Sequence, residues 1–208
     1  MGDHKIVRRN ATIVAIAITA CFAFHPENAR SQEKDKMLKD RDGNVYASKI
    51  MLDGKRWMTR NLNIKITDSY CYDGKEANCG RYGRLYTWDA AKNGCNMLGD
   101  GWRLPTDNEW REMAKHYGGV REDSADSGAA AYKALLDGGS SEFNVVLGGG
   151  RDSDGKYARL DAHGFYWSAT ESDARQAWLY NFGKGSQILN RHSDMEKQRA
   201  VSVRCIKP

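Results

Sequence analysis

The chain has 208 residues, a length that favours one domain with an appendage, and a formal net charge of +5 at pH 7. Lys5, Arg8 and Arg9 against Asp3 place +2 of that charge in the first 21 residues, which leaves only +3 for the remainder. The other basic residues are scattered rather than gathered into a stripe, so no nucleic-acid partner is expected.

The N-terminal segment has the pattern of an export signal. The uncharged run from Ala11 to Phe24 follows the basic residues and has fourteen residues, too few to span a bilayer comfortably. One interpretation makes residues 1–31 a signal peptide, cleaved after Ala29-Arg30-Ser31. A second makes residues 1–20 a lipoprotein signal, because Ile18-Thr19-Ala20-Cys21 resembles a lipobox, and leaves Cys21 lipidated. An uncleaved membrane anchor is the third.

These interpretations place the domain outside the cytoplasm, either secreted or attached to the outer membrane or cell surface. Any membrane attachment of the mature chain would come through the lipid on Cys21. Residues 32–42 are charged and polar, and predict a solvated tether before a domain at residues 43–208. Asp40-x-Asp42-Gly43-Asn44 could suggest a calcium loop, but the closing glutamate is missing, so a turn into the first strand is favoured.

The domain begins with a predicted β-hairpin. Apolar residues alternate over 44–51 and again over 55–62, and Asp53-Gly54 lies between the two runs as a turn.

Two helices are predicted in the centre of the chain. The first begins near Thr87, with apolar residues at Trp88, Ala91 and Cys95 on one face. The second follows Pro105, where Thr106 and Glu109 have the spacing of a capping box. Its apolar stripe is Trp110, Met113, Ala114 and Tyr117. A third, short helix is expected over 129–136.

The last third of the chain predicts short strands separated by turns. Alternating or apolar runs occur at residues 143–147, 156–158, 165–168, 177–182, 186–190 and 200–206. Together with the helices, they predict an α+β domain in which a twisted antiparallel sheet packs against two main flanking helices.

Four cysteines remain beyond the export segment: Cys71, Cys79, Cys95 and Cys205. An oxidising compartment favours disulfides, and four cysteines allow three pairings. A local Cys71–Cys79 bridge is sterically easy, and Cys95–Cys205 would then close the domain. A zinc site is disfavoured because no Cys-x-x-Cys pair exists and the five histidines are scattered. No metal and no cofactor are expected.

Several motifs in order resemble the Fibrobacter succinogenes major paralogous domain family. They are Cys71-Tyr72-Asp73, Tyr82-Gly83-Arg84-Leu85-Tyr86-Thr87-Trp88, Gly101-Trp102-Arg103-Leu104-Pro105-Thr106, Tyr166-Trp167-Ser168 and Ser202-Val203-Arg204-Cys205. The resemblance runs from about Asp42 to Lys207. It implies an exported protein, often lipid-anchored or surface-attached, with a C-type-lectin-like fold shared with formylglycine-generating enzymes. It also implies paired N- and C-terminal strands and a Cys95–Cys205 bridge.

The predicted function is a non-catalytic module that binds a polysaccharide or a cell-surface protein, or serves in adhesion. Trp178 and Tyr180 share a strand face and would stack on sugar rings if exposed, whereas the alternative is that they belong to the core. The polar candidates are Asn181, Asn190, Arg191 and His192, because the loop ahead of the last strand is a frequent ligand position in lectin-like folds.

Two other functions fit the sequence less well. Calcium-dependent sugar binding needs a Glu-Pro-Asn or Gln-Pro-Asp triplet, but the only prolines are Pro26, Pro105 and Pro208. An oxidase of the formylglycine-generating type needs a pair of reactive cysteines late in the chain, where only Cys205 lies. The protein is therefore not expected to be an enzyme.

Overall fold

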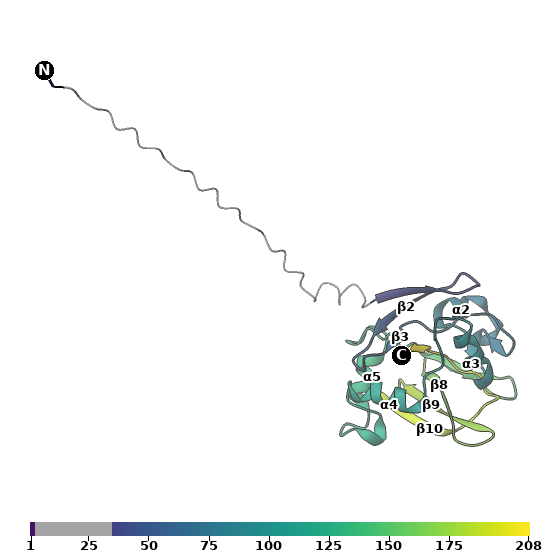
Figure 1. Ribbon diagram of the computed structural model, residues 1–208. Helices are drawn as coiled ribbons and strands as arrows, with labels where there is room; N and C mark the ends of the chain where they lie inside the picture. Colours follow the sequence, from purple (N-terminus) through teal and green to yellow (C-terminus); the bar gives the residue numbers. More distant parts are fainter. Residues whose placement is uncertain (3–34) are drawn as a thin grey trace.

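The computed structural model describes residues 1–2 and 35–208 (Figure 1). The predicted export segment, including Cys21 and the cleavage position after Ser31, lies outside the described residues. Within the part of the chain that is described, no helix is both long and apolar enough to cross a bilayer.

A four-stranded sheet joins the start of the domain to its end. Its order is β1 (Asp35–Lys39), β2 (Val45–Ile50), β3 (Arg56–Met58) and β11 (Ile206–Lys207). The β2–β3 hairpin is the one predicted, although both strands are shorter than expected. Ile206 pairs with Trp57, so the last strand lies beside β3 of the N-terminal hairpin, while β1, the first strand, lies at the opposite edge of the sheet.

Strand β1 corrects the prediction of a solvated tether over residues 32–42. Residues 35–39 pair in antiparallel fashion with β2, and Leu38 packs against the core. A turn at residues 40–44 connects the two strands: the Asp40 N–H donates to the Asn44 carbonyl at 3.0 Å, and the Gly43 N–H donates to the Asp40 carbonyl at 3.2 Å. The composition suggested a tether because the partly buried Leu38 and the exposed Met37 are the two apolar side chains in an otherwise charged and polar segment.

The five-stranded sheet contains the late strands. It consists of β6 (Gly148–Arg151), β7 (Tyr157–Leu160), β8 (His163–Glu171), β9 (Gln176–Gly183) and β10 (Ile188–Glu196), in the order β10-β9-β8-β6-β7. The prediction of an antiparallel sheet is corrected at one position, because β6 runs parallel to β8 at Gly149 and Gly164. A two-stranded sheet pairs β4 (Ser69–Tyr70) with β5 (Leu85–Tyr86).

Four α-helices occur among the described residues: α2 (Glu76–Tyr82), α3 (Trp88–Asn96), α4 (Asp107–Lys115) and α5 (Ala129–Leu135). Two short 3₁₀ segments, η1 (Tyr72–Gly74) and η2 (Arg121–Asp123), complete the helical parts. Helix α4 begins with the predicted capping box, in which Thr106 and Glu109 each accept from the other's backbone. Helix α3 begins at the expected place, but Thr87 makes no side-chain cap. Helix α2 was not predicted.

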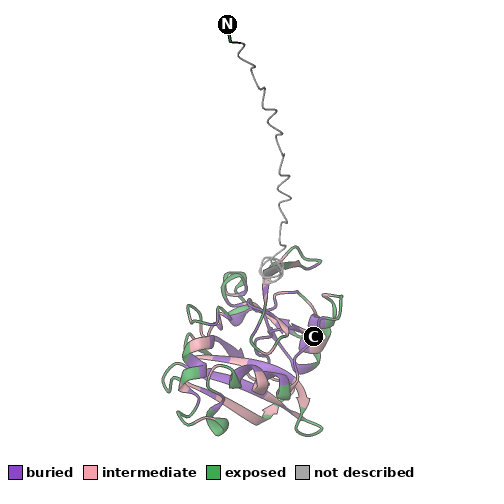
Figure 2. Cartoon of the chain, turned by 60° about the vertical axis from the view of Figure 1, so that its left-hand side comes forward, coloured by how far each residue is buried: buried purple, intermediate pink, exposed green. Residues whose placement is uncertain are grey.

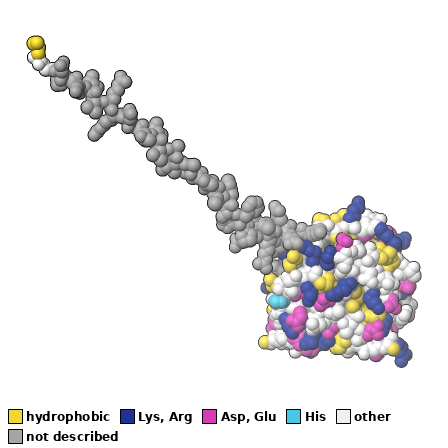
Figure 3. Space-filling view, in the orientation of Figure 1, with side chains coloured by type: hydrophobic (Ala, Val, Ile, Leu, Met, Phe, Trp, Pro, Cys, Tyr) yellow, Lys and Arg dark blue, Asp and Glu magenta, His cyan; other side chains and the backbone are white. Residues whose placement is uncertain are grey.

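The five-stranded sheet has apolar clusters on both faces. Figure 2 shows that its strands are largely buried or partly buried. Neighbouring residues of β8 point in opposite directions, so Tyr166 belongs to one cluster and Trp167 to the other. Trp110 of α4 joins the Tyr166 cluster, and Trp88 of α3 joins the Trp167 cluster. The domain therefore has the predicted α+β organisation, and its charged side chains are interspersed over the face shown in Figure 3.

Two disulfides close the domain, in the pairing that the spacing permits. Cys71 and Cys79 are 8 positions apart in the sequence, and Cys95 and Cys205 are 110 positions apart. Glu76 lies near the first pair of sulfurs. Because those sulfurs are bonded to each other, they offer no thiolate to a zinc ion.

Candidate functional site

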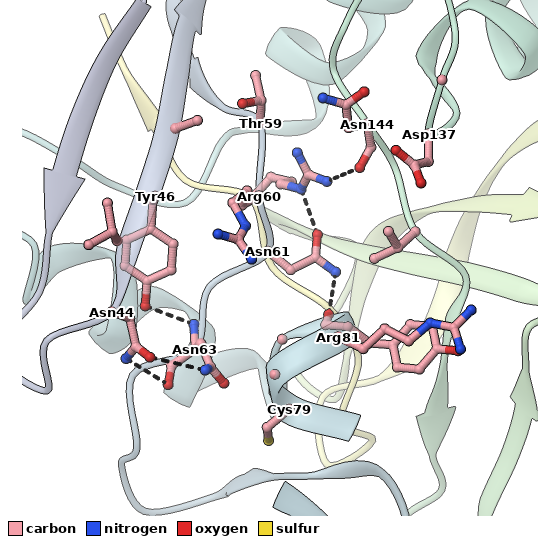
Figure 4. A pocket seen from close by; sticks show the side chains of 18 residues that line it. Asn44, Tyr46, Thr59, Arg60, Asn61, Asn63, Cys79, Arg81, Asp137 and Asn144 are labelled. Atoms are coloured by element: carbon pink, nitrogen blue, oxygen red, sulfur yellow. Dashed lines mark hydrogen bonds between the residues drawn. The ribbon is translucent and has the colours of Figure 1, made fainter. Parts of the chain in front are cut away.

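A cavity of about 680 Å³ opens beside helix α2 (Figure 4). Its walls come from the start of β2, the loop after β3, the end of α2 and the segment after α5, with Arg204 from the end of the chain. Figure 4 shows Asn44 and Asn63 at one side, and Asp137 and Asn144 at the opposite side. Residues that lie far apart in the sequence therefore face one space.

Arg204 joins two of these walls, the loop after β3 and the segment after α5. Its side chain is fully buried and has no carboxylate within hydrogen-bonding distance among the described residues. The guanidinium donates to Oδ1 of Asn61 at 2.6 Å and to the carbonyls of Met58 at 3.1 Å, Phe143 at 2.7 Å and Asn144 at 2.6 Å. Burial lowers the pKa of Arg204, since desolvation disfavours the charged form. The hydrogen bonds of the cation therefore all go to neutral oxygens, and the rings of Phe143 and Tyr166 lie 4.9 and 5.8 Å from it.

A hydrogen-bond network fixes the wall at the start of β2. Asn44 donates through Nδ2 to Oδ2 of Asp40 at 2.8 Å, and Asn63 donates to Oδ1 of Asn44 at 3.1 Å. The Tyr46 hydroxyl donates to the same Asp40 oxygen at 2.5 Å, while the other oxygen accepts the backbone N–H groups of Asp42 and Asn44. Burial, followed by this hydrogen bond, raises the pKa of Tyr46. Both Asp40 oxygens thus accept protein donors, which supports the turn over a calcium loop.

Other polar groups at the cavity have no such partners. Within the described residues, the side chains of Arg60 and Asp137 make no hydrogen bond or ion pair, and both are exposed. The amide of Asn144 is half-buried and also unpaired. Arg81 stacks on the ring of Tyr82 at 4.8 Å and lies 3.8 Å from the Asp161 carboxylate. The unpaired side chains of Arg60, Asp137 and Asn144 are available to a ligand.

The cavity lining offers hydrogen-bonding groups to a ligand. Among the described residues that line it there is no histidine, serine or lysine, and Asp137 is its single carboxylate. The sulfur of Cys79 belongs to a disulfide. Nucleophilic catalysis requires a nucleophile within hydrogen-bond reach of a base, and this lining offers no such pair.

The six residues predicted as ligand contacts lie elsewhere, on strands β9 and β10. The register pairs Asn190 with Asn181 and Arg191 with Tyr180. Because side chains alternate along a strand, Trp178, Tyr180 and Arg191 point to one face of the sheet. Asn181, Asn190 and His192 point to the other face. None of the six lines the cavity.

Tyr180 is a core residue, so the expectation that it could be exposed on a binding surface is corrected. Its ring is fully buried and stacks on Trp110 with centroids 5.0 Å apart. Its hydroxyl donates to the Asp107 carbonyl at 2.8 Å, and burial raises its pKa. Arg191 binds both Asp107 oxygens, at 2.6 and 2.5 Å, and covers the half-buried Trp178 ring at 3.4 Å.

The opposite face of the sheet carries the three polar candidates. Asn181 is 8% exposed, and its Oδ1 lies 2.9 Å from Nδ1 of His163. Asn190 and His192 are half-buried. Both belong to β10, because the strand expected over 186–190 continues through the segment that was expected to be a loop ahead of the last strand. The loop expectation fails because β10 continues through a bulge after His192.

The sequence reasoning did not identify the cavity residues as a site. The one available signal was Arg204, a charged residue between Val203 and Cys205 in an otherwise apolar strand pattern. A buried arginine requires acceptors nearby, so such a pattern indicates a polar centre. The sequence around Arg204 does not indicate which segments supply those acceptors.

A comparison with protein-family models matches residues 27–207 to the Fibrobacter succinogenes major domain. The match covers most of the chain, which therefore belongs to this family. No curated protein and no solved structure matches significantly.

Proposed function

We propose that this protein is an exported, non-catalytic module whose cavity beside α2 binds a polysaccharide or a glycan displayed on a cell-surface protein. The observation that carries the proposal is the set of unpaired polar side chains at the cavity, those of Arg60, Asn144 and Asp137. Amide, guanidinium and carboxylate groups together donate to and accept from sugar hydroxyls.

Export is part of the same proposal. Two disulfides in a chain of this size are typical of an oxidising compartment. Attachment through a lipid on Cys21 and free secretion after cleavage before Gln32 predict different masses for the mature chain. Intact-mass spectrometry distinguishes these two forms.

We further propose a C-type-lectin-like fold for the domain. The pairing of Ile206 with Trp57 and the bridge from Cys95 to Cys205 support it, because both bring the end of the domain back to its beginning. A fold does not determine a function, so the proposed binding activity rests on the cavity alone.

The alternative functions have less support from the described residues. A calcium-dependent lectin needs free oxygen ligands, but those of Asp40 are occupied by protein donors. An oxidase of the formylglycine-generating type needs reactive thiols, but Cys205 is bonded to Cys95.

The proposal is tested by presenting the full chain to a polysaccharide array, with and without a chelator. We expect binding that is insensitive to the chelator and is lost in Ala47→Tyr, which places a ring at the cavity wall. Ile50→Tyr adds the same ring to β2 outside the cavity lining and should bind normally. Binding that survives Ala47→Tyr contradicts the cavity assignment, and binding abolished by the chelator favours the calcium-dependent alternative.

A further inference from the structure

The charges around the cavity do not cancel. Arg60, Arg81 and Arg204 line it, against the single carboxylate of Asp137, so the lining carries a net charge of +2. Arg204 contributes a desolvated cation whose hydrogen bonds go to neutral oxygens and whose guanidinium lies 4.9 Å from the centre of the Phe143 ring. Charges in a concave, partly buried site are screened less than charges on an open surface, so the cavity has a positive potential.

A second pocket of about 1430 Å³ adjoins the first one. The two share Arg81, Tyr82 and Asp137 in their linings, and they therefore form one continuous groove. The second pocket adds Lys133 and Lys184 on the cationic side and Asp161 on the anionic side. Over the whole groove, five cationic side chains face two carboxylates, a net charge of +3.

The arginines in this groove differ in how free they are. Asp161 accepts a hydrogen bond from the Tyr82 hydroxyl at 2.6 Å and lies 3.8 Å from Arg81, which partly neutralises that guanidinium. Arg204 has its hydrogen bonds directed to the protein. Arg60 has neither an anionic partner nor a hydrogen bond among the described residues. The planar guanidinium of Arg60 is therefore the group best placed to donate two hydrogen bonds to an anionic group with two oxygens.

We infer that the groove selects an acidic polysaccharide, one whose sugars carry carboxylate or sulfate groups. Arg60 binds an anionic group in the first pocket, while Lys133 and Lys184 face the charges of neighbouring sugars along the second. Asp137 accepts sugar hydroxyls and weakens the attraction for anions. This inference rests on the proposed function, because it names the ligand class of the same site.

The test compares three polysaccharides of similar length against the full chain at 50 and 200 mM salt: a polyuronate, a sulfated polymer and a neutral polymer. We expect roughly tenfold tighter binding to at least one acidic polymer than to the neutral one, and a clear loss of that preference at the higher salt. The better of the two acidic polymers identifies the anionic group.

Three variants locate the effect in the groove. Arg60→Gln should weaken binding of the acidic polymer about fivefold, and Asp137→Asn should strengthen it by a similar factor, with neither changing the melting temperature. Arg121→Gln is the matched control, because Arg121 is exposed and lies in η2, outside both pocket linings. It removes the same charge and should leave binding unchanged.

The outcomes separate this inference from the proposed function. Equal affinity for neutral and acidic polymers overturns the inference and leaves the proposed function standing. Absence of binding to any polysaccharide overturns both. An equal effect of Arg60→Gln and Arg121→Gln, or equal binding to single-stranded DNA, would show attraction by net charge alone and also overturns the inference.

Discussion

Glu109 allows a direct test of what stabilises the fold, because its side chain both caps helix α4 and forms an ion pair with Arg103. Its carboxylate accepts two hydrogen bonds from the Arg103 guanidinium, each at 2.7 Å, and one from the backbone N–H of Thr106 at 2.9 Å. It is 8% exposed. Burial acts to raise the pKa of Glu109, but the hydrogen bonds from Arg103 and Thr106 outweigh it and lower the pKa from 4.5 to about 2.

Substitution of Glu109 by Gln keeps a capping oxygen but removes the charge. Because the folded-state pKa lies below the unfolded one, the ionised carboxylate stabilises the fold above about pH 4.5. That contribution is lost as the pH falls towards 2. A depression of this size corresponds to about 3 kcal/mol at 1.36 kcal/mol per pKa unit. Since the Arg103 side chain is 37% exposed, solvent screening reduces the expected effect to about 2 kcal/mol.

Urea unfolding at pH 7 and pH 3 measures this contribution. The free energy of unfolding of Glu109→Gln should be about 2 kcal/mol below that of the wild type at pH 7, and the difference should fall to about half at pH 3. Glu112→Gln is the control, because Glu112 lies on the same helix but pairs with Lys115 at the surface. Equal destabilisation at both pH values would mean that shape and packing, not charge, account for the role of Glu109.

Two further predictions concern the disulfides and Trp178. Opening Cys95–Cys205 by paired alanine substitutions should cost about 5 kcal/mol, against about 2.5 kcal/mol for Cys71–Cys79, because the longer bridge restricts the unfolded chain more. Urea unfolding gives both values, and a larger loss from the shorter bridge contradicts the chain-entropy reasoning. Trp178→Ala should lower the free energy of unfolding by about 1 kcal/mol, the value of its contact with a guanidinium, and leave polysaccharide binding unchanged. Lost binding at unchanged stability would instead move the ligand site to β9.

Local features of the fold could be predicted from the sequence because residues close together in the chain determine them. The Thr106–Glu109 capping box depends on a spacing of three residues, and the β2–β3 hairpin depends on a turn between two alternating runs. Strand β1 escaped prediction because its packing depends on one apolar residue, Leu38, among charged neighbours. Helix α2 escaped prediction because its first half lies within the Cys71–Cys79 disulfide loop, a segment whose composition is typical of a polar turn.

The candidate site could not be predicted in the same way, because it depends on contacts between distant segments. Alternation along β9 correctly places Trp178 and Tyr180 on one face, but it does not tell that α4 covers Tyr180. The residues that line the cavity could not be predicted for the same reason, because they come from distant segments. Asn61 and Asn144 are neighbours only because Arg204 donates to both, across sequence separations of 143 and 60 residues.

The segment that carries Arg204 explains why the cavity is held in one shape. Its backbone carbonyls at Val203 and Cys205 accept from Leu62 and Met58 in and after β3, each at 3.0 Å. Cys205 is also bonded to Cys95 of α3, so one short segment is fixed by backbone hydrogen bonds and by a covalent bridge. Arg204 points from this fixed backbone to the cavity. If the proposed ligand binds here, it meets a wall that is already ordered, and binding does not have to offset the entropy of arranging it.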